Sequence, residues 1–244
     1  GLLNLNKESE KIDLKGQVYY ADLDKINLSE KHAFLRTKFD MDFNGLSPDQ
    51  SSGYGNIKDL EVIYDEKYLF LDSLGLVSKL IDSTRNIDIN SDFFDAHLSG
   101  NFTLKKLLKD LQNLIDEYEL QLINDRDKIN IYYAEKGKKK EKYKAKWNFK
   151  FKDINPISSL FYPELFISQD IEVNGEILMG KTEIFNVYTN IDTIIYKNYQ
   201  FFDNEIDISS SKYSDSSNIL AFILIDSREQ KVGEDFEGEN LRLE

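Results

Sequence analysis

Apolar and polar residues alternate along much of this chain, with the two-residue period that places successive side chains on opposite faces of a β-strand. In Tyr143–Lys152, every odd-numbered residue is apolar and every even-numbered residue is polar. This alternation predicts a strand with one apolar and one charged face, as in antiparallel sheets that have one face in water. The same period predicts further strands at Ile57–Tyr64, Leu69–Leu76, Ile87–Ile89, Phe94–Phe102, Lys128–Tyr132, Ile171–Ile177 and Phe202–Ile208.

Other apolar runs predict strands of a different kind. Ile219–Ile225 is an unbroken apolar run, which is typical of a strand covered on both faces. Ile184–Tyr188 and Ile191–Tyr196 predict two more strands, and Thr189 with Asn190 between them predicts a tight turn.

Helical periodicity is clearest in one long segment. Apolar residues recur at helical spacing over 104–118, which predicts an amphipathic helix with Thr103 as its N-cap. Lysines lie near its start and acidic residues near its end, against the helix dipole, so packing of the apolar side must stabilise it. A second, short helix is predicted at Pro156–Tyr162, with Asn155 as its cap, and a single helical turn is predicted at Asp22–Ile26.

Glycine recurs two residues after an apolar residue, within or beside predicted strands. A glycine in an alternating strand permits a bulge, a bend or the close approach of another group. Repeated bends on one face would curl a sheet. The alternative is an ordinary β-sandwich with glycines at its bends, and the glycine pattern alone favours this simpler interpretation. The positions are Gly16, Gly45, Gly100 and Gly175.

Composition narrows the class of protein. A chain of 244 residues that is 41% hydrophobic and 13% aromatic is too apolar for a disordered protein, and without cysteine it has no disulfide scaffold, cysteine zinc site or thiol nucleophile. Its net charge of −13 argues against a nucleic-acid partner. No apolar stretch is long enough for a transmembrane helix. We expect residues 1–244 to form one section of a longer protein, with a candidate sub-boundary near 119–127.

A basic stretch stands out against the acidic total. Nine lysines and a single glutamate lie between Lys136 and Lys152. The pattern favours a solvated hairpin tip around Gly137 followed by the outward face of a strand; anionic lipid head groups or nucleic acid are the alternatives.

Residues with catalytic chemistry are few. His32 and His97 are the two histidines, neither lies in a ligand or triad motif, and His97 falls on the polar side of its predicted strand, which favours a solvated histidine. The chain has no glycine-rich phosphate loop and no hydrolase or metalloprotease motif. Close carboxylate pairs arise by chance among 44 acidic residues. We therefore expect no enzyme, and no catalytic, metal or cofactor site.

The apolar faces of two predicted strands are the remaining candidate site. Such a face either packs as core or lines a lipid groove, and pattern cannot separate these readings, because a lipid tail and a packed side chain are equally apolar neighbours. The candidate lipid-groove residues are Tyr143, Trp147, Phe149, Phe151, Val173 and Ile177.

Several segments resemble the TamB family of AsmA-like proteins. Ser91–Phe102, followed by the leucine-rich helix, is similar to a Ser-Asp, Asp-Ala, apolar-x-Gly-x-Phe run that leads into such a helix in that family. Ile154–Leu165 followed by Val173–Ile177 is similar to its short helix and returning strand. The preceding part of this section of the TamB family also has counterparts in this chain. They are the segments Phe43–Leu46, Leu60–Tyr64 and Leu69–Leu74, which are similar to it.

This resemblance implies that the chain is a periplasmic section of a large Gram-negative envelope protein. The parent protein would be the inner-membrane component of a translocation and assembly module, anchored in the inner membrane by a helix outside this chain. It implies a mainly β fold: a curled antiparallel sheet forming an open groove or flattened half-barrel with an apolar interior, one amphipathic helix and one or two short helical inserts. The implied partners are phospholipid acyl chains and, through the parent protein, an outer-membrane barrel of the Omp85 class, with no catalytic residues. The alternative is a β-rich interaction or structural module that binds no lipid.

Overall fold

Within the residues that it describes, the computed structural model shows a mainly β protein with three helices and a single sheet of 14 strands. It describes residues 1–4, 10–45, 47–123, 125–135, 141–214, 216, 218–233 and 236–243. The strands are β1 (Leu2–Asn4), β2 (Lys11–Asp22), β3 (Ala33–Asn44), β4 (Ser52–Tyr64), β5 (Lys67–Ile81), β6 (Thr84–Ser91), β7 (Phe94–Gly100), β8 (Tyr143–Phe151), β9 (Leu165–Ile167), β10 (Ile171–Met179), β11 (Thr182–Tyr196), β12 (Tyr199–Tyr213), β13 (Leu220–Val232) and β14 (Phe236–Leu243).

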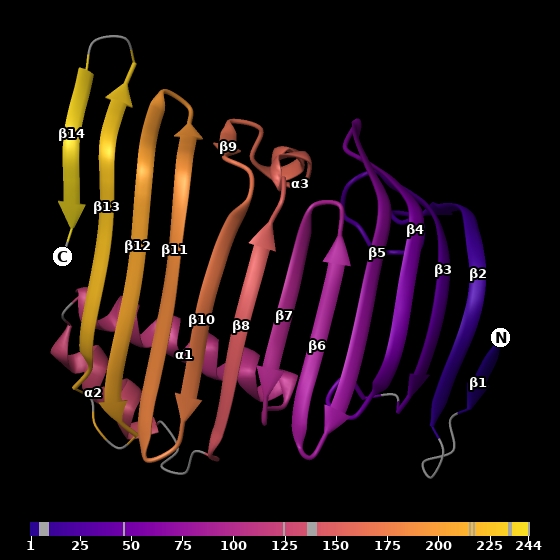
Figure 1. The fold of residues 1–244 in the computed structure, drawn as a ribbon, viewed down its shortest axis with the longest axis horizontal. Helices are drawn as coiled ribbons and strands as arrows, with labels where there is room; N and C mark the ends of the chain where they lie inside the picture. The colour runs from indigo at the N-terminus through magenta and orange to yellow at the C-terminus, as the bar shows by residue number, and fades with distance from the viewer. Residues whose placement is uncertain are drawn as a thin grey trace.

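All neighbouring strands are antiparallel, and their order in the sheet follows the chain from β1 to β8 and then from β10 to β14 (Figure 1). The short β9 pairs with β11 beside this path. β1 and β14 are the outermost strands, so the sheet is open and does not close into a barrel. The expected curled, open antiparallel sheet with few helices is therefore confirmed, and the sandwich reading of the glycine pattern is wrong for the described residues, which form one sheet.

The helices are insertions between strands that pair directly. α1 (Leu104–Ile123) and α2 (Arg126–Glu135) connect β7 to β8, and α3 (Asn155–Phe161) lies between β8 and β9. In Figure 1, α1 crosses the lower half of the sheet behind the strands from β8 to β13, and these strands continue upward past it. The ladder between β7 and β8 is complete without the helices, because Phe94 lies opposite Phe151 and Gly100 opposite Ala145.

Most of the elements predicted from periodicity are present. The predicted strands at 57–64, 69–76, 87–89, 171–177 and 202–208 lie in β4, β5, β6, β10 and β12. Those at 94–102 and 143–152 correspond to β7 and β8, which end earlier, at Gly100 and Phe151. The predicted helix at 104–118 is α1, which continues to Ile123. Thr103 precedes it, and its carbonyl accepts a hydrogen bond from the Leu107 N–H, as an N-cap residue does.

One strand prediction and one turn prediction are wrong. Lys128–Tyr132 lies in α2, because Tyr132 and Tyr133 turn toward α1 and donate hydrogen bonds to Glu117. Thr189 and Asn190 do not form a turn: β11 runs without interruption, since both residues pair with β12 within one long ladder.

Three further predictions at element boundaries and faces need correction. Ile219–Ile225 lies mostly in β13 but is not covered on both faces, and Phe222 is 47% exposed, because the sheet is a single layer there. Asn155 does not cap α3 from outside; it lies in the helix, and its side chain binds the backbone of Ile167. Residues 23–27 after β2 form a hydrogen-bonded turn and not a helix.

Cross-strand pairing separates the sheet into an apolar and a polar face. On the polar face, Lys15 Nζ lies 2.8 Å from Asp40 and Lys144 Nζ 3.0 Å from Glu176. Exposed pairs of this kind contribute roughly 0–1 kcal/mol each, so they hydrate this face more than they stabilise it. Gly16, Gly100 and Gly175 all lie on the opposite, apolar face, whereas Gly45 follows β3 at φ +87°.

Candidate functional site on the apolar face of the sheet

The candidate site is the face of the sheet on which α1 lies, referred to below as the apolar face. Directly opposed residues of neighbouring strands share a face, so the pairing from β2 to β13 defines its side chains. They include Leu14, Phe39, Met41, Ile57, Leu74, Leu76, Ile87, Ile89, Phe94, Leu98, Trp147, Phe149, Phe151, Val173, Val187, Ile206, Ile208 and Ile223.

The lower end of this face is closed by α1. The buried cluster there consists of Phe102, Leu107, Tyr143, Ala145, Ile177 and Met179, and Leu104 and Leu111 of α1 pack against it. Two of the predicted groove residues, Tyr143 and Ile177, belong to this cluster. The structure thus places them in ordinary core beneath a helix, and they do not line the open part of the face.

The other four predicted groove residues lie farther along the strands: Trp147 packs against the edge of this cluster, and Phe149, Phe151 and Val173 lie past it. Phe149 is opposite Val173, Phe151 is opposite both Phe94 and Ile171, and Trp147 lies over Gly175. A Cβ atom added to Gly175 would come within 2.2 Å of the Trp147 ring, so the absence of a side chain there lets the indole lie flat on β10. The four predicted residues are half-buried.

Most of the apolar face outside the cluster beneath α1 is half-buried in the same way, including Phe39, Met41, Leu76, Ile89 and Ile208. At the upper end of the strands lies α3, where Lys67 Nζ donates hydrogen bonds to the carbonyls of Ser159 (2.9 Å) and Leu160 (2.8 Å). The open part of the apolar face therefore lies past α1, toward the upper ends of the strands. Most of its side chains are apolar, although Thr189 of β11 lies among them opposite Val173 and Ile206. The backbone N–H and C=O groups of the strands around it pair with each other in the sheet.

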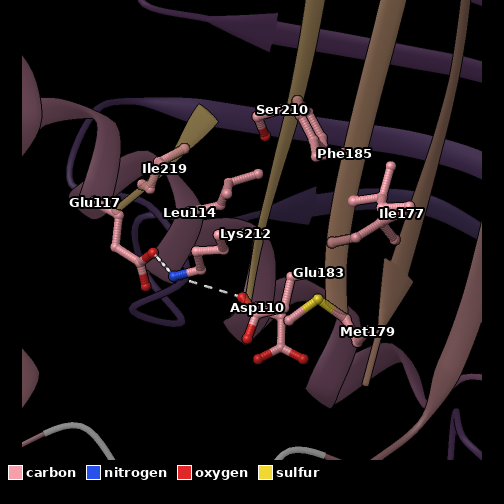
Figure 2. Close-up of a pocket in the computed structure, with 11 residues that line it drawn as sticks. Asp110, Leu114, Glu117, Ile177, Met179, Glu183, Phe185, Ser210, Lys212 and Ile219 are labelled. Carbon is pink, nitrogen blue, oxygen red and sulfur yellow. Dashed lines mark hydrogen bonds and ion pairs between the residues drawn. The ribbon is translucent and has the colours of Figure 1, made fainter. Parts of the chain in front are cut away.

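A buried polar cluster fixes α1 and α2 to the lower end of the sheet (Figure 2). The Lys212 side chain is 2% exposed and lies between Glu117 of α1, which is 1% exposed, and Glu183 of β11, whose Oε2 is 3.5 Å from Lys212 Nζ. Tyr132 and Tyr133 of α2 donate hydrogen bonds of 3.2 and 3.1 Å to Glu117. Lys212 therefore joins two helices to two strands.

Tyr143 makes a second polar contact beneath α1. Its hydroxyl donates a hydrogen bond of 3.0 Å to Asp110 Oδ2. Burial, together with the neighbouring Asp110 carboxylate, raises the pKa of the Tyr143 hydroxyl well above its usual value. The free space between this region and Lys212 is about 10 Å³, which is no more than one water molecule needs. This cluster is thus a closed structural junction and not a ligand pocket.

Sequence reasoning missed Lys212 and Glu183. Both continue the alternation of their strands on the apolar side, where Glu183 lies opposite Lys212. A polar residue at an apolar position was the available signal, but its partner Glu117 is 95 residues away in the chain, so nothing local identifies the pair.

The lysine-rich stretch forms part of the polar face wherever it is described. Lys144, Lys146, Lys150 and Lys152 all lie within 4 Å of a carboxylate of a neighbouring segment, at Glu176, Asp170 or Asp95. This supports the solvated strand face that the pattern favours. Lys136, Gly137, Lys138, Lys139 and Lys140, and Leu46 of the TamB-like segments, lie outside the described residues.

Both histidines contact aspartates at the surface. His97 lies on the polar face, 2.6 Å from Asp88, as its position in the alternation predicts. His32 Nδ1 lies 3.2 Å from Asp24, and the ligand atoms of Asp22, Asp24 and His32 are within 4.8 Å of one another. These are metal-ligand types, but Lys25 binds Asp22 and His32 binds Asp24, so each side chain has a partner without an ion.

None of the helices in the described residues is both long enough and apolar enough to cross a membrane. Comparison of the chain with protein-family models, curated proteins and solved structures finds no match. Its function therefore has to be inferred from the geometry and chemistry of the apolar face.

Proposed function

We propose that the open part of the apolar face binds the acyl chains of phospholipids, and that the chain is a section of an elongated β-groove protein that moves phospholipid between membranes. The observation that carries this proposal is the half-buried apolar surface that continues from β2 to β13, on a sheet whose other face is charged. Monomeric soluble proteins rarely leave a continuous apolar surface of this extent uncovered unless something binds to it.

The chemistry of the face favours an acyl chain over an extended peptide. An extended peptide lying on it would bury its own N–H and C=O groups against mostly apolar side chains that offer few hydrogen bonds, which is costly. An acyl chain has no such groups and gains about 0.8 kcal/mol for each CH₂ that leaves water. Because burial is not directional, we expect little discrimination between acyl chains of different length.

The TamB-like segments support a wider setting for this binding. In that setting the parent protein is anchored in the inner membrane of a Gram-negative bacterium, this section lies in the periplasm, and the parent acts in outer-membrane biogenesis with a barrel protein of the Omp85 class. These are proposals about the parent protein, and they depend on acyl-chain binding by this section.

The direct test is native mass spectrometry of the purified protein, with lipid extraction and identification of the lipids. Phe149→Asp places a charge on the open apolar face, and we expect it to abolish most lipid recovery. Asn148→Asp is the matched control, because Asn148 is the preceding residue of the same strand but faces the polar side, where it contacts Asn174 at 2.7 Å. Thermal denaturation of both variants checks that Phe149→Asp remains folded.

Recovery of a lipid-free wild-type protein that also fails to take up added phospholipid would refute the proposal. Equal lipid recovery from the wild type and from a folded Phe149→Asp variant would also refute it, because the bound lipid would then lie elsewhere.

A second candidate function is protein binding by strand addition. β14 is an outermost strand of the sheet, and most of its residues are exposed. An outermost strand can pair with an extended segment of another chain. Hydrogen exchange distinguishes the two functions: a protein partner added to β14 protects the backbone amides of that strand, whereas acyl chains bound to the side chains of β8 and β10 leave the amides of β14 unchanged.

A further inference from the structure

The helix α1 exposes large apolar side chains although it also packs on the sheet. Leu108 is 65%, Ile115 59% and Leu122 80% exposed. They are seven residues apart, so they form one row along the helix, about 21 Å long at 1.5 Å per residue. We call this row the α1 stripe.

The contacts of α1 show on which side of the helix this row lies. Asp110 and Glu117 face the lower ends of the strands, where they meet Tyr143 and Lys212. Leu104 and Leu111 pack against the buried cluster, as do Leu98, Trp147 and Phe185, which lie farther along the strands than Tyr143 and Lys212.

Residues four positions apart lie on the same side of a helix. Leu108 and Ile115 are four residues after Leu104 and Leu111, so the α1 stripe is the next row on that same side. It therefore borders the open part of the apolar face. The buried polar cluster causes this orientation, because it turns Asp110 and Glu117 of α1 inward and leaves part of its apolar side uncovered.

Two lysines lie at one end of the stripe. Lys105 and Lys109 flank Leu108 and are both exposed, whereas Asp116 and Glu119 lie beside Ile115 and toward Leu122. The stripe is thus basic at its start and acidic along its second half. An amphiphile with an anionic head group complements this arrangement if its head lies at Lys105 and Lys109 and its tail runs toward Ile115 and Leu122.

We propose that α1 is the second wall of the lipid site: the α1 stripe and the open part of the sheet together enclose an acyl chain, whose anionic head group is bound by Lys105 and Lys109. This inference rests on the proposed acyl-chain binding and adds to it the position of the chain and the sign of its head group. It also explains why these apolar side chains remain at the surface of a charged protein.

The test measures binding of cis-parinaric acid, an anionic fluorescent fatty acid, and of its neutral methyl ester. The variant Leu108→Asn, Ile115→Asn, Leu122→Asn removes the stripe at exposed positions, so it spares the core. Its control is Gln112→Asn with Gln121→Asn, which places the same residue type at two other exposed positions of the helix without changing its charge. We expect affinity for the acid to fall at least tenfold in the stripe variant and to change less than threefold in the control.

A second variant tests the head group. Lys105→Glu with Lys109→Glu should weaken binding of the acid at least fivefold and leave binding of the methyl ester within twofold of the wild type. An equal effect on both probes would refute the role of the two lysines.

The outcomes separate this inference from the proposed function. If the stripe variant binds the acid as the wild type does while Phe149→Asp does not, α1 is not a wall of the site, although the sheet still binds acyl chains. If the wild type binds neither probe, the proposed function itself fails. A wild-type protein that self-associates through the stripe and binds no probe would also overturn the inference.

Discussion

Replacing Lys212 by methionine removes the one cation of the buried cluster beneath α1. The substitution keeps the length of the side chain but leaves the Glu117 and Glu183 carboxylates facing each other with almost no solvent exposure. Breaking a buried ion pair by removal of one partner costs about 3–5 kcal/mol, because the remaining charge stays in a medium of low polarity. We expect Lys212→Met to destabilise the protein by about that amount.

For a chain of this length, 1 kcal/mol corresponds to roughly 2–4 °C in melting temperature, so the expected decrease is about 6–20 °C. Differential scanning calorimetry measures it, and urea titration gives the free energy of unfolding independently. The matched control is Lys144→Met, whose partner Glu176 lies on the solvated polar face at 3.0 Å. Loss of that exposed pair should cost no more than about 1 kcal/mol.

Removal of all three charges distinguishes the ionic explanation from a simple packing defect. Lys212→Met combined with Glu117→Gln and Glu183→Gln leaves no uncompensated charge, so much of the lost stability should return. If Lys212→Met costs no more than Lys144→Met, or if the triple variant is less stable than Lys212→Met alone, the cluster does not act as an ion pair that holds α1 to the sheet.

Two further variants report on the same region. Tyr143→Phe removes the donor to buried Asp110 and should cost about 1–3 kcal/mol at neutral pH. Because the pKa of Tyr143 is raised in the folded protein, its neutral hydroxyl stabilises the folded state fully below the unfolded-state pKa of about 10, and this stabilisation is lost as the pH rises above that value. The fall in melting temperature above pH 10 should therefore be shallower in Tyr143→Phe than in the wild type. An unchanged pH profile would contradict this role of Tyr143. Gly175→Ala places a Cβ within 2.2 Å of the ring of Trp147, the single tryptophan, so it should displace the indole, cost about 1–3 kcal/mol and shift the emission spectrum, whereas an unshifted spectrum would show that the ring does not lie there.

Several elements of the fold follow from short-range pattern alone. Tyr143–Phe151 alternates strictly, so it forms a one-sided strand in any antiparallel sheet that buries one face. The leucines of α1 recur at helical spacing over five turns, which no strand would accommodate on one face. In both cases the segment that shows the period is long enough to exclude the other type of secondary structure.

Where the pattern is short, contacts with distant residues decide. Five residues at Lys128–Tyr132 fit a strand or a helix, and the helix forms because α2 packs on α1 through Tyr132, Tyr133 and Glu117. Thr189 and Asn190 have the composition of a turn, but pairing along the whole of β12 keeps them extended. The apolar run in β13 indicates two covered faces, yet no sequence pattern reveals whether a second layer of structure exists to cover them.

The sequence by itself determined that the protein has a one-faced antiparallel sheet and one long amphipathic helix, because the periods of two and 3.6 residues are local properties of the chain. Only the tertiary structure decided which part of the apolar face is closed. The pair formed by Lys212 and Glu117 joins residues 95 positions apart and sets the rotation of α1. That rotation buries Tyr143 and Ile177, leaves Phe149 and Val173 half-buried, and turns Leu108, Ile115 and Leu122 outward. Long-range electrostatic contacts of this kind have no periodic signature in the sequence, which is why the extent of the candidate site could not be read from it.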